Sequence, residues 1–301
     1  MNLALSKSSA LVTRKFREFF WPTVLATMAM QFGAILDSII VGNLIGADAM
    51  AGVGVCMPLN QILAAVSFLL TVGAGSMIAV AAGARQQDEA NRIFSAVLIL
   101  NGLAALIFLL VLVPNISETA AFLAGQGNIA ELAYQYLFIV IWRIPFSMFG
   151  VAGSILIRSD GMAKLASQSV LLSQIVNVGL DLLLIGAGGM GMAGAAIATV
   201  TGDAAGMAWL SLRYFQSKDR SLSFVGLQSG LKNFLELTCR LLSVGFPVAV
   251  GMGLISIKIW CIYRILGMTG GSDAMTMCPY PITTQTPAFI TLPKTVAQNF
   301  L

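Results

Sequence analysis

The sequence contains no histidine and few charged residues. The absence of histidine from all 301 residues removes the most common general base, proton shuttle and metal ligand. Charged residues make up 10% of the chain, whereas a soluble domain carries about 25%. Hydrophobic residues make up 57%. Most of the chain is therefore expected to lie in lipid, and enzymes that depend on histidine chemistry are excluded.

The cysteines and the basic residues form no recognisable site either. The four cysteines have no metal-binding or redox spacing, so we expect neither a zinc site nor a disulfide framework. The basic residues lie in short clusters between apolar runs, whereas nucleic-acid binding requires a continuous basic face. We therefore expect a membrane protein that is not an enzyme, has no organic cofactor and has no nucleic-acid partner.

Seven apolar runs are long enough to cross a membrane, which takes about 20 residues. They occupy residues 19–41, 52–80, 93–113, 134–157, 165–186, 190–212 and 241–266. The first run lacks a small-residue cleavage site, so we interpret it as a membrane helix rather than a signal peptide. The predicted fold is all-α: a polytopic membrane helix bundle.

The distribution of lysine and arginine between the runs predicts the orientation. These residues are found in the N-terminal tail and in the connections 81–92, 158–164 and 213–240. The alternate connections, 42–51, 114–133, 187–189 and 267–277, contain none. The positive-inside rule therefore predicts a cytoplasmic N-terminus in a multi-pass protein of the cell (inner) membrane.

The first and seventh runs are related by an internal repeat. With an offset of 225 residues, Pro22 aligns with Pro247, and Asp-Ala-Met at 48–50 aligns with Asp-Ala-Met at 273–275. Two parallel six-helix units are a known transporter architecture. We therefore expect a six-helix lobe plus a seventh helix that begins a second lobe.

The repeat is not continued after residue 277. Four prolines fall in the last 24 residues, at positions 279, 281, 287 and 293, and they prevent a membrane helix there. Our hypothesis is a truncated or frame-shifted product, and a genuine extended tail is the alternative. The expected organisation is a cytoplasmic tail (1–18), a six-helix lobe (19–212), a cytoplasmic connection (213–240), the first helix of a second lobe with the start of its loop (241–277) and an anomalous Pro-rich tail (278–301).

Six ionisable residues lie within the predicted spans. A charge at the centre of a membrane helix costs about 2.5–3.5 kcal/mol on insertion scales, so each is a candidate for function. They are Asp37, Arg143, Asp181, Asp203, Lys258 and Arg264.

Four polar residues are predicted to lie at one depth, near the outer side. At about 1.5 Å per residue, Asp37 and Asp181 lie roughly 6 Å below the outer ends of their helices. Asn177 lies one turn deeper than Asp181 on the same helix face, and Thr199 reaches the depth of Asn177. Such hard oxygen ligands suit a small hard cation, and two adjacent carboxylates suit proton exchange. Polar contacts that only hold helices together remain the alternative.

Three further residues, at other depths, have predicted roles. Asp203 lies one turn inward from Thr199 and is either a second station for a proton or cation or the ion-pair partner of Arg143. Asp48 precedes a helix at the outer surface, so we expect it to be an N-cap. Pro22, near the inner end of the first helix, is a candidate hinge.

Several stretches together resemble the MATE (multidrug and toxic compound extrusion) transporters. They are Asp-Ser-Ile-Ile-Val-Gly at 37–42, Arg-Ile-Pro at 143–145, Arg-Ser-Asp-Gly at 158–161 and Gly-Ala-Ala-Ile-Ala-Thr at 194–199. The resemblance covers residues 15–277. It implies the N-terminal lobe of a twelve-helix transporter plus the first helix of the second lobe, with a central cavity between the lobes.

The resemblance also implies a function. Family members exchange Na⁺ or H⁺ for organic, often cationic compounds, and the matching cation site here would be Asp37, Asn177, Asp181 and Thr199. Pro22 matches a proline implicated in bending of the first helix. Because five helices of the second lobe are missing, we expect a truncated form that is inactive alone. The alternatives are a lipid-linked sugar flippase of the wider superfamily, with Arg143 as its cavity cation, and a non-transporting fragment.

Overall fold

The computed structural model describes residues 2–125, 127–225 and 230–276, and these residues form helices and connections without a β-strand. The helices in chain order are α1 (Asn2–Leu44), α2 (Ala47–Val55), α3 (Met57–Gly83), α4 (Gln87–Leu112), α5 (Ile116–Ala124), α6 (Asn128–Val140), the 3₁₀ helix η1 (Ile141–Arg143), α7 (Ile144–Ser159), α8 (Ala163–Asp181), the π-helix η2 (Leu182–Ala187), α9 (Gly191–Gln216) and α10 (Gly230–Thr276). The Pro-rich tail predicted at 278–301 lies outside the described residues.

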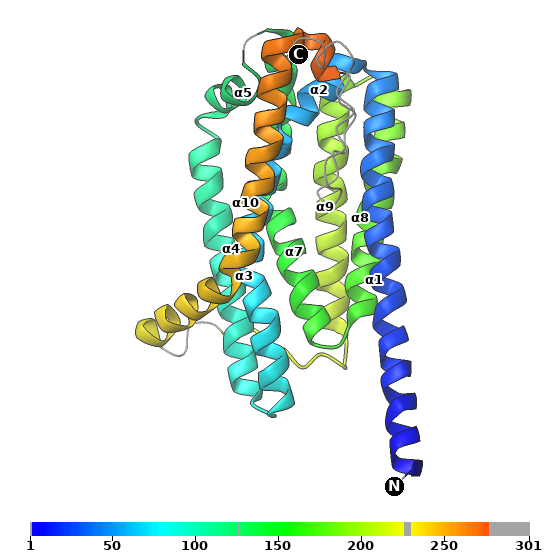
Figure 1. The fold of residues 1–301 in the computed structure, drawn as a ribbon, viewed down its shortest axis with the longest axis vertical. Helices are drawn as coiled ribbons and strands as arrows, with labels where there is room; N and C mark the ends of the chain where they lie inside the picture. Colours follow the sequence, from blue (N-terminus) through cyan, green and yellow to red (C-terminus); the bar gives the residue numbers. More distant parts are fainter. Residues whose placement is uncertain (1, 126, 226–229, 277–301) are drawn as a thin grey trace, which may run out of the picture.

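The predicted all-α membrane bundle is confirmed. Within the described residues, seven spans are long and apolar enough to cross a membrane. They are Phe20–Leu44, Ala47–Gly83, Gln87–Leu112, Asn128–Ser159, Ala163–Ala187, Gly191–Gln216 and Asn233–Ile265. The long helices run roughly alongside one another, and the N-terminal part of α1 projects beyond the bundle (Figure 1).

Two of the seven spans are interrupted helices. The second span changes direction between α2 and α3, and the fourth changes at η1, between α6 and α7. A proline occupies the first turn after each break, Pro58 in α3 and Pro145 in α7. Proline is tolerated there because the N–H that it lacks would have no partner in the first turn of a helix. The short α5 was not predicted, because nine residues are too few to give a membrane signal.

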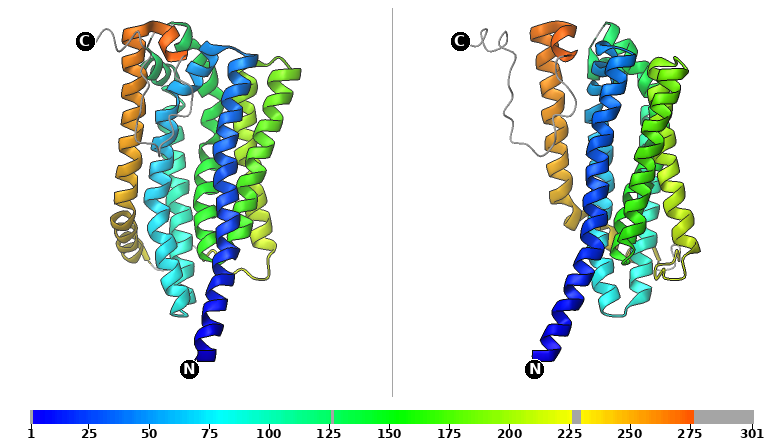
Figure 2. Two further views of the ribbon diagram at one scale, coloured as in Figure 1. Left: turned by 45° about the vertical axis from the view of Figure 1, so that its right-hand side comes forward. Right: turned by 90° about the vertical axis from the view of Figure 1, so that its right-hand side faces the viewer.

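The helices pack in a chain of neighbours around the lobe. Helix α1 lies against α8, α8 against α9, and α9 against both α6 and α7. Helix α10 lies on another side of the lobe, against α3 and α2 (Figure 2). A ring of exposed apolar side chains covers the outer surfaces of α1, α4 and α10, as expected of helices that face lipid.

The predicted N-cap at Asp48 is wrong. The N-cap of α2 is Gly46, whose φ of +130° disfavours residues with a side chain, and no side chain caps this helix. Asp48 instead lies in the first turn, where its Oδ2 accepts a hydrogen bond from Asn128 Nδ2 at 3.0 Å. A carboxylate in the first turn still stabilises the helix dipole.

Helix α10 is seated closely on the lobe. A side chain at Gly245 would clash with the carbonyl oxygen of Leu69 on α3, so glycine allows the two backbones to approach. Further along α10, Ser256 Oγ donates a hydrogen bond to the Pro58 carbonyl oxygen at 2.8 Å. The seventh helix therefore packs on the lobe through small and polar residues, as membrane helices commonly do.

An extended segment crosses the end of the bundle that carries the basic connections. This segment, residues 217–225, is named the strap below. Its backbone N–H groups at Ser223 and Val225 donate to Asn91 Oδ1 (2.8 Å) and Ser95 Oγ (2.9 Å) of α4. The strap is thus fixed to α4 by its main chain.

Asp160 is the central acceptor of a second set of strap contacts. Its Oδ2 accepts hydrogen bonds from the Tyr214 hydroxyl at 2.7 Å and the Ser221 backbone N–H at 3.1 Å. The Ser221 hydroxyl donates to Oδ1. The Tyr214 oxygen in turn accepts a hydrogen bond from the Leu222 N–H at 3.3 Å. One carboxylate therefore connects the end of α7, the end of α9 and the strap.

We predict that Asp160→Ala releases the strap. The Tyr214 and Ser221 groups would lose their shared acceptor, at a cost of about 1–3 kcal/mol. Trypsin should then cut faster after Lys218 and Arg220, and the Tm should fall. Asp88→Ala is the control, because Asp88 is an exposed carboxylate in the first turn of α4, outside the strap. Equal cleavage rates for both variants would contradict the role given to Asp160.

Candidate cation site

Three helices position the four residues predicted to form a cation site. Asp37 lies on α1, Asn177 and Asp181 lie on α8, and Thr199 lies on α9. Because α8 packs against both α1 and α9, it connects the other two helices. The structure therefore places all four residues on one group of neighbouring helices.

The two carboxylates face one another. The side chains of Asp37 and Asp181 are close enough to share a hydrogen bond. Asp181 is fully buried, and neither of its carboxylate oxygens has a hydrogen-bond partner among the described residues. A buried carboxylate without a donor is costly, so the site favours a bound cation or a proton on one carboxyl group.

A tyrosine that the sequence analysis missed completes this level. Tyr136 of α6 is 4% exposed, and its hydroxyl lies close enough to the Thr199 hydroxyl for a hydrogen bond. Its oxygen is also near enough to Asp37 for an electrostatic interaction. Thr199 Oγ1 itself donates to the Ala195 carbonyl at 2.9 Å, so its lone pairs remain available. The sequence carries no signal for Tyr136, because the depth of a residue along a helix does not give the direction in which its side chain points.

Glycines determine how closely α8 and α9 approach at Asn177. A Cβ atom at Gly202 would lie 2.9 Å from Asn177 Cβ and 2.9 Å from the Ser173 carbonyl oxygen. One turn later, a Cβ at Gly206 would lie 2.8 Å from Ser173 Cβ. This Gly-x-x-x-Gly face brings the α8 backbone against α9. Asn177 lies one turn from Asp181 on α8. The glycine contact holds it next to α9, the helix that carries Thr199.

The backbone changes immediately after Asp181. Helix α8 ends at this residue and continues as the π-helix η2, whose sequence is Leu-Leu-Leu-Ile-Gly-Ala. Such wide turns are rare and are common at functional sites. The change of pitch re-aims the chain directly beyond the buried carboxylate.

Asp203 has an ion-pair partner. Arg143 donates from Nε and Nη2 to Asp203 Oδ2, both at 2.9 Å. Arg143 Nη1 also donates to Asn60 Oδ1 at 3.2 Å, and Ser173 Oγ lies 3.5 Å from Asp203 Oδ1. Of the two roles that the sequence left open for Asp203, the structure displays the pair with Arg143.

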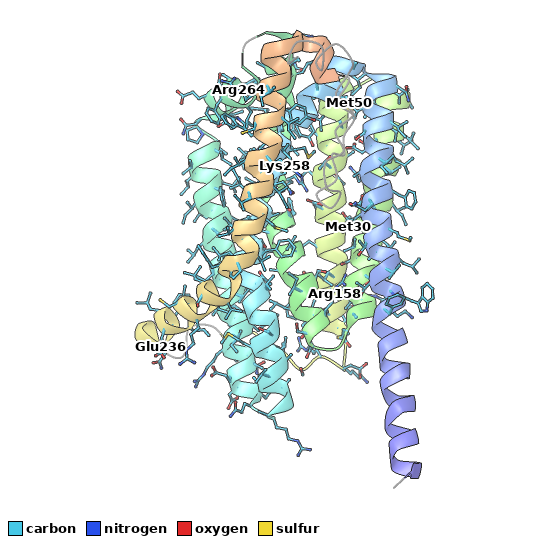
Figure 3. All side chains as sticks on the ribbon, in the orientation of Figure 1. Met30, Met50, Arg158, Glu236, Lys258 and Arg264 are labelled. Atoms are coloured by element: carbon cyan, nitrogen blue, oxygen red, sulfur yellow. The ribbon has the colours of Figure 1, made fainter. Side chains whose placement is uncertain are left out.

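Pro22 lies inside a continuous α1. The next residue, Thr23, accepts a hydrogen bond from Arg158 Nη1 at 3.1 Å. Arg158 belongs to the last turn of α7, near the lower end of the bundle in Figure 3. The segment around the proline is therefore tied to α7, and a role of Pro22 as a hinge stays a prediction.

The donor set fits a small hard cation. Two carboxylates, an amide and two hydroxyls supply oxygen atoms, which hard cations prefer. The described residues contain no group of three or more His, Cys, Asp and Glu side chains that could hold a metal ion. The arrangement therefore suits a monovalent ion or a proton better than a tightly bound divalent metal.

Comparison with known proteins places the chain in a family. The MatE family model matches residues 22–183. The chain belongs to the MatE family. The matched range runs from the middle of α1 through α8 and includes Asp37, Asn177 and Asp181. MATE proteins are secondary transporters, which agrees with the expectation that the chain is not an enzyme.

Two similar bacterial proteins are longer than this chain. The probable multidrug resistance protein YoeA of Bacillus subtilis is 24% identical over 294 residues, covering 95% of this chain and 62% of YoeA. The multidrug export protein MepA of Staphylococcus aureus is 24% identical over 237 residues, covering 78% of this chain and 52% of MepA. The chain thus spans about half to three fifths of the relatives it matches.

Solved MATE structures share the fold. An inward-facing conformation of a multidrug resistance MATE family transporter of the MOP superfamily superposes with a TM-score of 0.74 at 25% identity, covering 81% of this chain and 55% of that one. An outward-facing conformation gives a TM-score of 0.74 at 23% identity, covering 87% and 57%. The fold of the lobe is therefore compatible with both conformations.

We predict that Gly202→Ala weakens the site. The added methyl group would push Asn177 and Ser173 away from α9, at a cost of about 1–3 kcal/mol for overpacking. A lower Tm and weaker cation binding should result. Gly179→Ala is the matched control, because a Cβ at Gly179 of α8 meets open space and should stabilise the helix slightly. A Gly202→Ala variant as stable as the Gly179→Ala variant would contradict this packing.

Proposed function

We propose that this chain supplies the cation-binding lobe of a Na⁺- or H⁺-coupled antiporter that exports organic, drug-like cationic compounds. The observation that carries the proposal is the pair of facing carboxylates, Asp37 and Asp181, one of which is buried without a hydrogen-bond donor. Such a pair gains stability from binding a cation or a proton. Binding and release can therefore be linked to a change in how α1 and α8 pack.

The proposed ligands are Asp37, Asn177, Asp181 and Thr199, and Tyr136 is added as a group that orients Thr199. The Tyr136 hydroxyl interacts with Thr199 and lies close to Asp37, so it joins α6 to the site. A Na⁺ ion would supply the positive charge that the two carboxylates lack. In a proton-coupled mechanism, one carboxyl group would carry the proton instead.

The names of the relatives support drug-like compounds as cargo. YoeA is described as a probable multidrug resistance protein and MepA as a multidrug export protein. We extend that cargo class to the protein to which this lobe belongs. The clustering of lysine and arginine at one end of the bundle also supports a cytoplasmic N-terminus in the cell membrane.

A sugar-lipid flippase is less consistent with the structure. That alternative used Arg143 as a cation lining the cavity. The Arg143 guanidinium is bonded to the Asp203 carboxylate and to Asn60 instead. Its charge is therefore balanced within the lobe, and no observation favours an anionic lipid-linked cargo.

We predict that the purified chain binds Na⁺ and that Asp37→Asn and Asp181→Asn abolish this binding. The amide in Asp181→Asn could donate a hydrogen bond to Asp37, which would relieve the repulsion between the two carboxylates. That variant should therefore have a higher Tm than the wild type without Na⁺ and show no further rise when Na⁺ is added. Calorimetry and thermal unfolding at neutral pH measure both effects.

Asp48→Asn is the control for these variants, since Asp48 is a carboxylate of α2 whose hydrogen-bond partner among the described residues is Asn128. It should bind Na⁺ like the wild type. Absent Na⁺ binding, with helical content intact, would remove the sodium form of the proposal. If the pH dependence of the Tm were also the same in the wild type, Asp37→Asn and Asp181→Asn, cation coupling through this site would be disproved.

We also predict that residues 1–301 do not export drugs by themselves. A cavity between two lobes needs side chains from both, and the described residues comprise one lobe and one additional helix. Efflux of a fluorescent cationic dye from cells that express the chain provides the measurement. Robust efflux above the level of the Asp37→Asn variant would show that these residues are sufficient for transport.

A further inference from the structure

A second level of polar residues lies one helical turn from the proposed cation site. Asp203 follows Thr199 by four residues on α9, and Ser173 precedes Asn177 by four residues on α8. Residues four apart lie on the same face of a helix. The ion pair of Arg143 with Asp203 is therefore stacked directly beneath the site.

Arg143 is close to both sets of carboxylates. Its guanidinium bonds Asp203 at 2.9 Å and is also near enough to Asp37 for their charges to interact. Tyr136 interacts electrostatically with both Asp37 and Arg143. The Arg143 guanidinium thus pairs directly with Asp203 and also interacts, at longer range, with Asp37.

We propose that Arg143 is an exchangeable counter-ion: it pairs with Asp203 when a cation or proton occupies the Asp37–Asp181 site and turns toward those carboxylates when the site is empty. The inference rests on the proposed function and deepens it. Arg143 would act as a positioning residue that competes with the transported cation. When the cation leaves, the positive charge of Arg143 would then take its place beside the Asp37–Asp181 carboxylates.

The bonds of Arg143 and Asp203 are compatible with such an exchange. Besides Asp203, Arg143 donates a hydrogen bond to Asn60, a neutral acceptor. Breaking the hydrogen bond to Asn60 would separate no ion pair. Asp203 would keep the neighbouring Ser173 hydroxyl as a donor after Arg143 leaves. The guanidinium side chain is long, always charged and able to bond two acceptors, which suits exchange between carboxylates.

The position of Arg143 connects the exchange to the backbone. Arg143 is the last residue of η1, the break between α6 and α7 in the fourth span. Asn60 and Asp203, which accept its hydrogen bonds, lie on α3 and α9. A change from Asp203 to Asp37 would therefore alter contacts with α1, α3 and α9 at the break between α6 and α7.

The test is a double-mutant cycle between Arg143 and Asp37, measured by thermal unfolding without Na⁺ at one neutral pH. Arg143→Gln, Asp37→Asn and the double variant give the coupling in the wild-type background. The same cycle is then repeated with Asp203→Asn present. A cycle isolates the interaction between two residues from their separate contributions.

If Arg143 exchanges partners, removing the Asp203 carboxylate favours its pairing with Asp37 in the Asp37–Asp181 site. The coupling should then increase by about 3 °C in Tm. Saturating Na⁺ should abolish that increase, because the ion displaces the guanidinium. A fixed Arg143–Asp203 pair predicts instead the same coupling in both backgrounds, and that result would overturn the inference.

One variant controls for the loss of a carboxylate elsewhere, and a second replaces Asp203→Asn if that variant does not fold. Glu236→Gln removes one carboxylate from an exposed ion pair with Arg240 near the basic end, and the coupling in that background should equal the wild type. Asp203→Asn removes the negative charge at this position and keeps a hydrogen-bond acceptor for Arg143. Asp203→Ser is a second neutral replacement, used if Asp203→Asn does not fold.

The cycle also separates this inference from the proposed function. Failure of cation coupling would be seen in the wild type, as a Tm that responds neither to Na⁺ nor to pH in a way that depends on Asp37 and Asp181. Failure of the exchange would be seen without Na⁺, as a coupling that Asp203→Asn leaves unchanged. The test of the Arg143 exchange can therefore fail while cation coupling holds, and the reverse is also possible.

Discussion

The close approach of α8 and α9 determines where the polar groups of the lobe can lie. Gly202 and Gly206 have no side chain, and the backbone of α8 occupies the space that a Cβ would need. This contact holds Asn177 next to the helix of Thr199 and Ser173 beside Asp203. Without it, the two levels of polar residues would separate, and each would face lipid, which offers no hydrogen bonds.

The lobe distributes its charges by depth. At the basic end, Asp160 is fully satisfied by the strap and Tyr214, so it serves packing. In the middle, Asp203 is balanced by Arg143. Nearer the far end, Asp181 has no donor at all among the described residues. The unsatisfied carboxylate therefore lies at one level, because protein donors satisfy the other two acidic groups.

Much of this arrangement follows from the sequence, and some of it does not. Apolar length predicted the seven spans, and depth along each helix placed Asp37 and Asp181 at one level. The rotation of a helix about its axis is not encoded in depth, so Tyr136 was missed and the partner of Asp203 stayed open. The N-cap at Asp48 failed because the positive φ of Gly46 determined where α2 begins.

The agreement with both inward-facing and outward-facing transporters restricts where movement can occur. The chain superposes on an inward-facing and on an outward-facing structure with a TM-score of 0.74 each, which shows a shared fold. Helix α10 is bound to the lobe through Gly245 and Ser256, and the strap is bound through its backbone. The lobe, the strap and the first helix beyond it therefore form one packed unit. Within that unit, α1 packs against α8, and these two helices carry Asp37 and Asp181.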